Sequence, residues 1–148
     1  MKNNIIKDSF IRISPTVWAE KFDFPLGWFV INYKLFDGKF ERRKAHGKWY
    51  KIKSEKGQVI YRILRFSTNL SVVNDNNKIV LDWMGWIDLN GRDGDEKSPL
   101  GLEISKAKFH ELIYCGLSHP DPAFRLSTLL GIISVSVSII SLIIAFVL

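Results

Sequence analysis

The sequence has little cysteine and little histidine, and this limits the chemistry that it can support. Cys115 is the single cysteine among 148 residues, which excludes an internal disulfide and is typical of a reducing compartment. The three histidines, His46, His110 and His119, do not have a zinc-ligand spacing, and the chain offers them no second sulfur. We therefore predict no metal site and no cofactor.

The sequence also lacks the short motifs that carry well-known reactions. It contains no GxxxxGK[ST] phosphate-binding loop, no GxGxxG, no GxSxG and no HExxH. His110 and Cys115 are five residues apart on a predicted helix, a spacing that does not bring a Cys–His nucleophile pair together. We predict that the protein is not an enzyme, and we name no catalytic residue.

Charge is absent from the last 23 positions, 126–148, which also lack His, Asn and Gln. As a helix with a rise of ~1.5 Å per residue, this stretch is about 34 Å long, and the hydrocarbon core of a bilayer is ~30 Å thick. Core helices of soluble proteins rarely extend so far without a charge. The stretch therefore predicts a transmembrane helix that anchors a single-pass membrane protein by its C-terminal end.

The N-terminal segment, MKNNIIKDSFIRIS, lacks the apolar stretch of about 7–15 residues found in signal peptides. The basic residues nearest the predicted span, Lys106, Lys108 and Arg125, all precede it, and positive flanks favour the cytoplasmic side. We expect a cytoplasmic β-rich domain over 1–118, a proline-containing hinge over 119–125 and the transmembrane helix over 126–148.

Most of the region between residues 9 and 90 has the alternation and the aromatic and β-branched content of strands. The predicted strands are 26–36, 39–45, 48–53, 58–66 and 78–89. Asp37-Gly38 predicts a hairpin between 26–36 and 39–45, and the turn over 54–57 predicts a hairpin between 48–53 and 58–66. Residues 74–77 are predicted to form a loop. With no internal repeat visible, the pattern indicates a mainly β fold: a small antiparallel barrel or sandwich of about five or six strands, one short helix and a C-terminal transmembrane helix.

The region that follows is expected to be a polar loop over 90–99 and a short amphipathic helix over 105–117, capped by Ser105. Within 78–89, alternation predicts one face with Leu81, Trp83 and Leu89 and the other with Trp86. Asp121-Pro122 is typical of a helix start, so we predict that the membrane helix begins at Pro122.

The positive charge of the chain is concentrated between residues 34 and 57. This segment has nine Lys or Arg against three acidic residues, a balance of +6, which equals the net charge of the whole chain. Three explanations of this concentration of charge remain open. The segment is a charged edge strand that is protected against aggregation, it contacts an anionic lipid surface, or it binds a nucleotide or nucleic acid. The predicted basic ribbon is Lys39, Arg42, Arg43, Lys44, Lys48, Trp49, Tyr50, Lys51 and Lys53, in which the two rings would stack on bases.

Small residues recur through the apolar stretch at spacings of four and three. The stripe is Ser127, Gly131, Ser134, Ser138, Ser141 and Ala145. Such a heptad spacing puts small side chains on one helical face, where helix backbones in lipid can approach closely. We predict a homo-oligomer formed through this stripe, from which Ser136 is excluded. Chance placement in a monomeric anchor and a different membrane partner remain the alternatives.

These patterns predict a membrane-tethered binding or sensor module. Its β-rich domain would bind a ligand or partner while its span self-associates. A specific version is a membrane-disrupting or pore-forming effector, such as those of bacterial antiviral defence. The alternative is an accessory subunit of a larger membrane protein complex, with the stripe facing another protein's helix.

Overall fold

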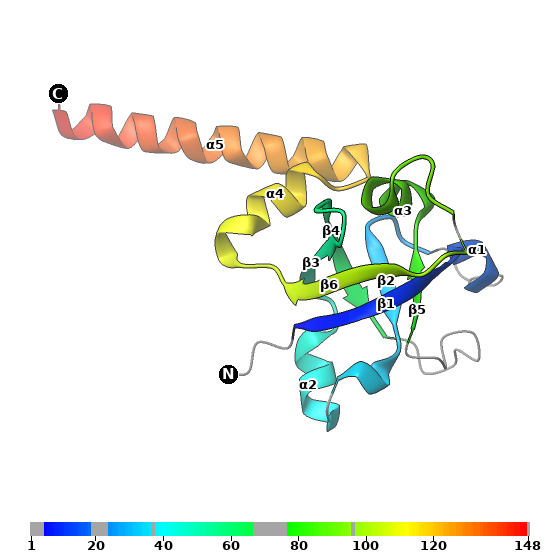
Figure 1. The fold of residues 1–148 in the computed structure, drawn as a ribbon. Coiled ribbons are helices and arrows are strands. Elements are labelled where there is room, and N and C mark those ends of the chain that lie inside the picture. The colour runs from blue at the N-terminus through cyan, green and yellow to red at the C-terminus, as the bar shows by residue number, and fades with distance from the viewer. Residues whose placement is uncertain (1–4, 19–23, 37, 67–76, 96, 148) are drawn as a thin grey trace.

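The computed structural model describes residues 5–18, 24–36, 38–66, 77–95 and 97–147 (Figure 1). Within these ranges the strands are β1 (Ile6–Ile13), β2 (Trp28–Ile31), β3 (Trp49–Ser54), β4 (Val59–Arg65), β5 (Lys78–Leu81) and β6 (Leu100–Lys106). The α-helices are α1 (Pro15–Trp18), α2 (Gly38–Ala45), α3 (Trp83–Asn90), α4 (Leu112–Leu117) and α5 (Pro122–Val147). Two short 3₁₀ helices are η1 (Tyr33–Leu35) and η3 (Phe109–Glu111).

The described strands form one mixed sheet in the order β1-β5-β2-β4-β3-β6, and β6 pairs with β1, which closes the sheet into a barrel. The prediction of an antiparallel sheet is wrong, because β1 pairs with β5 in parallel and β2 pairs with β4 in parallel. The β-rich character and the C-terminal apolar helix are confirmed. The described residues contain several helices, however, where the sequence predicts one short helix before the span.

The barrel consists of two halves in which the strands and the helix before the third strand follow in the same order, β1-β2-α2-β3 and β4-β5-α3-β6, although the first half also contains α1 and η1. The pairings of one half reproduce those of the other: β1 with β5 matches β4 with β2, and β1 with β6 matches β4 with β3. The halves join through β2–β5 and β3–β6, and Val30 faces Val80 at the centre of the first contact. The fold thus has an approximate two-fold symmetry that no sequence repeat reveals.

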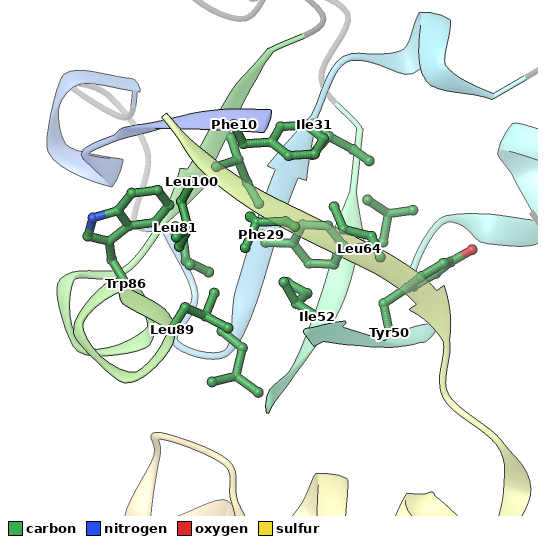
Figure 2. Packing of buried hydrophobic residues seen from close by; sticks show 14 of the residues in the cluster. Phe10, Phe29, Ile31, Tyr50, Ile52, Leu64, Leu81, Trp86, Leu89 and Leu100 are labelled. Atoms are coloured by element: carbon green, nitrogen blue, oxygen red, sulfur yellow. The ribbon is translucent and has the colours of Figure 1, made fainter. Parts of the chain in front are cut away.

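One apolar cluster fills the barrel (Figure 2). Phe10, Phe29, Ile52 and Leu64 come from four different strands, and none of them is exposed to solvent. Because alternate residues of a strand point to opposite faces, each strand contributes every second side chain to this interior. The hairpin predicted between 48–53 and 58–66 is confirmed as the antiparallel pair β3–β4.

The segment predicted as strand 39–45 is instead the helix α2, and the predicted Asp37-Gly38 hairpin is wrong. Strand β2 ends at Ile31, and the Asn32 side chain accepts a hydrogen bond from the Lys34 amide at 2.9 Å, which starts the turn η1. Gly38 follows with a φ of +77°. The α2 sequence consists mostly of Lys, Arg, Glu and Ala, residues that favour helix once the chain has turned.

The predicted strand 78–89 also divides into two elements. It is extended only in β5 and is helical in α3, so the alternation assigned to it is wrong beyond Leu81. Trp86 and Leu89, three residues apart, are buried on one side of α3, whereas Trp83 is 47% exposed. Asp82 starts the helix, because its carboxylate accepts the Gly85 amide at 2.8 Å.

Asp82 also forms a largely buried ion pair with Arg62 of β4. The Arg62 Nε atom lies 3.0 Å from the Asp82 Oδ1 atom, and the Arg62 Nη1 atom donates to the Tyr61 carbonyl at 2.9 Å. Only 4% of the Arg62 side chain and 14% of the Asp82 side chain are exposed. Both charges are therefore compensated where β4 meets the first turn of α3.

The helix predicted over 105–117 begins later than expected. Ser105 belongs to β6, and the helical residues are those of η3 and α4. Residues 74–76 of the predicted 74–77 loop lie outside the described residues. The start of α5 at Pro122 is confirmed, and the Asp121 carboxylate accepts the Ala123 amide at 2.9 Å.

Candidate functional site

The structure divides the predicted basic ribbon between a helix and a strand. Lys39, Arg42, Arg43 and Lys44 lie on α2, Lys48 is exposed in the connection between α2 and β3, and Trp49, Tyr50, Lys51 and Lys53 lie on β3. Figure 1 shows α2 on the opposite side of the barrel from α5. Strand β3 pairs with β4 on one side and with β6 on the other, so the charges do not protect an exposed sheet edge.

On α2 the charged side chains differ in their surroundings. The Arg42 guanidinium lies over the Tyr33 ring at 4.6 Å and donates to the Phe36 carbonyl at 3.2 Å, so it holds η1 against the helix. Lys44 lies 4.1 Å from the centre of the Phe40 ring. Lys39, Arg43 and Lys44 are exposed and form the part of α2 that is available to an anion.

The two aromatic residues of the ribbon are packed rather than free to stack on bases. Tyr50 is 4% exposed and meets Phe29 and Phe36 edge-on, at 6.1 Å and 6.3 Å between ring centres. Burial, together with the nearby Glu41 charge, raises the pKa of Tyr50 to about 12. Its hydroxyl therefore stays protonated at neutral pH.

Trp49 joins the barrel to α5. Its ring lies 5.8 Å from His119 and 6.1 Å from Phe124, and the rings of His119 and Phe124 are stacked at 4.3 Å. Burial lowers the pKa of His119, so the ring stays neutral, and its Nδ1 atom accepts the Asp121 amide at 3.1 Å. These contacts fix the first turn of α5 on β3.

A second contact holds α4 against α5. A Cβ atom added to Gly116 would lie 2.6 Å from the Thr128 Cγ2 atom, so the two helices approach as closely as glycine allows. A Cβ atom added to Gly27 would overlap the His119 ring. The absence of side chains at both glycines therefore lets the end of the domain pack closely.

Lys51 is part of a polar network beneath η3. Its Nζ atom lies 2.7 Å from the Glu111 Oε1 atom, the Tyr61 hydroxyl donates to the same oxygen at 3.3 Å, and the Lys108 amide donates to Oε2 at 2.8 Å. The Lys108 amide, and next the Lys51 ammonium, lower the pKa of Glu111 to about 2. The network attaches η3 to β3 and β4.

Beside this network lies a groove of about 410 Å³ with a basic lining. Lys51 and Lys53 of the predicted ribbon line it together with Lys106 and Lys108, which the pairing of β3 with β6 brings to the same place. Glu103 also lines the groove, and its carboxylate pairs with Lys7 at 2.9 Å. Spacing along the chain does not reveal this grouping, because β3 and β6 are far apart in sequence.

The predicted stripe is exposed along the length of α5. The serine hydroxyls at 127, 134 and 138 donate to the carbonyl four residues earlier, at 3.0, 2.9 and 2.8 Å. Ser136, outside the stripe, does the same at 2.9 Å. What distinguishes the stripe is shape, because Ser134 and Ser138 line a shallow hollow between larger side chains.

Cys115 is fully buried, and burial raises the pKa of its thiol to about 11. A thiol in this state is a poor nucleophile, because the thiolate is the reactive form. Among the described residues, no group of three or more His, Cys, Asp or Glu side chains is arranged to hold a metal ion.

Sequence reasoning missed the apolar surface formed by η3 and α4. Phe109 is 88% exposed, Tyr114 is 62% exposed and Ile113 is 54% exposed. The signal was present in the sequence, because 112–117 reads LIYCGL and contains no charged residue. The amphipathic helix predicted here therefore has no polar face.

No family model and no curated protein matches this chain. Among solved structures, the chain is similar to the rationally designed apDPBB_sym_79 protein, with 12% identity over 70% of this chain and 100% of that chain and a TM-score of 0.43. It is also similar to the rationally designed mkDPBB_sym1 protein, with 13% identity over 69% of this chain and 100% of that chain and a TM-score of 0.40.

Proposed function

We propose that this chain is a single-pass membrane protein in which α5 crosses the bilayer, the barrel is a cytoplasmic binding module and the spans self-associate. The observation that carries the proposal is the exposure of α5. This helix has 26 residues, and none of its most apolar window is buried inside the protein. A helix that is apolar on every side needs an apolar environment, and the barrel does not supply one.

The length of α5 fits this role. From Leu126 onward it carries no charge, and its serine hydroxyls at 127, 134, 136 and 138 are bonded to backbone carbonyls. Unsatisfied polar groups are costly in hydrocarbon, and this internal bonding removes that cost. One helix of the described residues is thus long and apolar enough to cross a membrane.

The orientation that we propose places the barrel in the cytoplasm. Arg125 lies at the start of the apolar run, and Lys106 and Lys108 are exposed on the part of the domain that leads to it. Basic residues beside a span are enriched on the cytoplasmic side of membranes. The same side carries the anionic lipid that a basic domain contacts most favourably.

Self-association of the span is supported by the shape of the stripe. Since the hydroxyls are bonded within the helix, they are not the main reason for helices to meet. Small side chains at positions 134 and 138 instead leave a hollow that a neighbouring helix can enter. Close packing of this kind is one of the forces that drive helices together in lipid.

The barrel, as we propose it, is non-enzymatic and binds an anionic ligand or partner. The exposed charges of α2 and the lysine-lined groove are the two surfaces that support this. Clustering of spans after binding would make the protein a membrane-disrupting effector. As an accessory subunit it would instead present the stripe to a helix of another protein.

A pair of matched substitutions tests self-association. Ser138→Leu should reduce crosslinking between full-length chains in lipid vesicles, because the leucine side chain fills the hollow. Ser136→Leu is the control: it changes the size of the side chain by the same amount and removes the same kind of hydrogen bond to the backbone, but it should not reduce crosslinking. Equal effects at the two positions would contradict self-association through the stripe.

Two further measurements distinguish an effector from a subunit. Dye leakage from vesicles that contain the wild-type chain, but not from vesicles that contain Ser138→Leu, supports the effector. Stoichiometric co-purification of a larger membrane protein supports the accessory subunit.

A further inference from the structure

The helix α4 lacks the polar outer face that a surface helix in water has. The side chains of Leu112, Ile113, Tyr114 and Leu117 are between 40% and 62% exposed, and Phe109 of η3, at 88%, extends this surface. The interfacial patch, as we name it, consists of these five residues. In soluble proteins a helix with apolar residues on all sides is buried.

Two exposed rings elsewhere on the barrel, Trp83 and Phe40, each have a cationic side chain over one face. Trp83 lies under the Arg12 guanidinium at 5.1 Å, and Phe40 lies under the Lys44 ammonium at 4.1 Å. No side chain among the described residues covers the rings of Phe109 and Tyr114 in this way. The five exposed apolar residues of the patch all belong to η3 and α4, within positions 109–117, so they are grouped on two consecutive elements rather than scattered over the domain.

The position of the patch is fixed by α5. Gly116 of α4 contacts Thr128, which is three residues beyond Arg125 and already inside the apolar run. Figure 1 shows α4 beside the first turns of α5, on the side of the barrel from which α5 extends. Whatever environment receives the beginning of α5 therefore also receives α4.

Basic residues border the patch. Lys106 and Lys108 are exposed directly before η3, and Arg125 is exposed where α5 begins its apolar run. Two acidic residues lie in this region, and both are engaged: Glu111 is buried and paired with Lys51, and the Asp121 carboxylate accepts the Ala123 amide at the start of α5. The border is thus positive, and positive charge beside an apolar surface is complementary to anionic lipid headgroups.

From these observations we infer that η3 and α4 insert into the headgroup region of an anionic membrane, beside α5, and hold the barrel at a fixed orientation on the bilayer. This inference rests on the proposed function, in which α5 spans that membrane. The patch enters the boundary between headgroups and acyl chains, and Lys106 and Lys108 contact lipid phosphates. Tyr114 is one of the two aromatic residue types enriched in this zone, and the apolar ring of Phe109 would enter on the acyl-chain side.

The test measures the depth of single sites in the full-length chain. A nitroxide is attached at Ile113→Cys, Phe40→Cys or Ser134→Cys, each in a Cys115→Ala background and in vesicles of phosphatidylcholine and phosphatidylglycerol. Collision rates with oxygen and with a water-soluble nickel complex then give the depth of each label. We expect the label at 113 to lie roughly 5–10 Å below the phosphates, the label at 40 to be in water and the label at 134 to be deep in the hydrocarbon.

The three positions separate the two proposals. If the label at 113 is as accessible to nickel as the label at 40, and the label at 134 is deep, the inference that the patch enters the membrane is wrong. The proposal that α5 spans the membrane is then unaffected. If the label at 134 is also in water, the proposed function itself is wrong. A third outcome is spectral broadening of the label at 113 that disappears when the vesicles are diluted with lipid, after which the label is in water. This outcome would show that a second copy of the chain covers the patch, and it would overturn the inference that the patch enters the membrane.

Two further variants protect the test against misfolding and against non-specific insertion. A chain that retains Cys115 and carries Ile113→Cys should be labelled selectively at 113, because Cys115 is buried and 113 is exposed. Lys106→Gln with Lys108→Gln should make the depth at 113 independent of the phosphatidylglycerol content. The same depth dependence in this double variant and in the parent chain would contradict the role of the lysines.

Discussion

Gly116 of α4 lies against Thr128 of α5 so closely that a Cβ atom on Gly116 would be 2.6 Å from the Thr128 Cγ2 atom. Together with the stacked rings of His119 and Phe124, this contact makes the end of the domain and the start of α5 one packed unit. The connection between the barrel and α5 is therefore packed against both of them and is not a free linker. Its orientation relative to α5 follows from side-chain packing.

Gly116→Val should push α4 away from α5. A branched side chain cannot fit against Thr128, and overpacking of this kind costs about 1–3 kcal/mol. We expect a lower unfolding temperature of the full-length chain in detergent, measured by circular dichroism. Ser136→Val is the control, because it places the same branched side chain at an exposed position of α5 outside the stripe. An equal loss of stability for the two variants would mean that the contact with Thr128 has no energetic importance.

Glu111 should make stability depend on acid pH. Its pKa is lowered to about 2 in the folded protein, against ~4.3 for a free glutamate, so its contribution is fully present above about pH 4.3 and is lost as pH falls toward 2. Glu111→Gln should lower the free energy of unfolding at pH 7 and flatten its decline below pH 4.3, measured by urea denaturation. The exposed Glu55→Gln variant should retain the wild-type profile. A wild-type decline in Glu111→Gln would exclude the Glu111 network as its cause.

Arg62→Leu should destabilise the barrel strongly. It leaves Asp82, whose side chain is 14% exposed, without its charge partner, and the loss of one member of a buried ion pair typically costs about 3–5 kcal/mol. The measurement is the urea midpoint of unfolding, with the exposed Arg92→Leu as control. A change below about 1 kcal/mol, the range of surface pairs, would show that solvent screens this pair.

The exposed charges of α2 should bind polyanions. We expect the full-length chain in uncharged nanodiscs to bind a single-stranded oligonucleotide at low salt, and binding should weaken steeply as salt rises, because screening limits the interaction to about 8 Å at physiological ionic strength. Lys39→Glu with Arg43→Glu should abolish it, whereas Lys97→Glu with Arg92→Glu should not. Arg42 is left unchanged because it also holds the Phe36 carbonyl. Equal losses in the two double variants would indicate a net-charge effect rather than a site.

Local sequence signals predicted some elements well. The β3–β4 hairpin and the start of α5 depend on alternation, turn residues and capping, all of which act within a few residues. The strand predicted over 39–45 rests on the Asp37-Gly38 turn signal, and the one over 83–89 rests on alternation. Both predictions are wrong, because the chain turns at Gly38 and at Asp82 and then continues as a short helix.

The grouping of the site residues was beyond such signals. The parallel pairs β1–β5 and β2–β4 bring together segments that are distant in the chain, and so does the pairing of β3 with β6. Lys51 meets Glu111, and Trp49 meets Phe124, only because the barrel closes. The sequence shows that residues 112–117 are apolar. That they lie beside the start of α5 follows only from the contact between Gly116 and Thr128.

The proposed function rests on the claim that α5 crosses a membrane and that the barrel faces the cytoplasm, and protease protection measures both. The full-length chain carries one epitope before Met1 and another after Leu148, and protease is added to sealed cells that express it. We expect the C-terminal epitope to be lost while an N-terminal fragment containing residues 1–120 stays intact until the cells are permeabilised. Digestion of the N-terminal fragment in sealed cells, or retention of both epitopes, would contradict the claim.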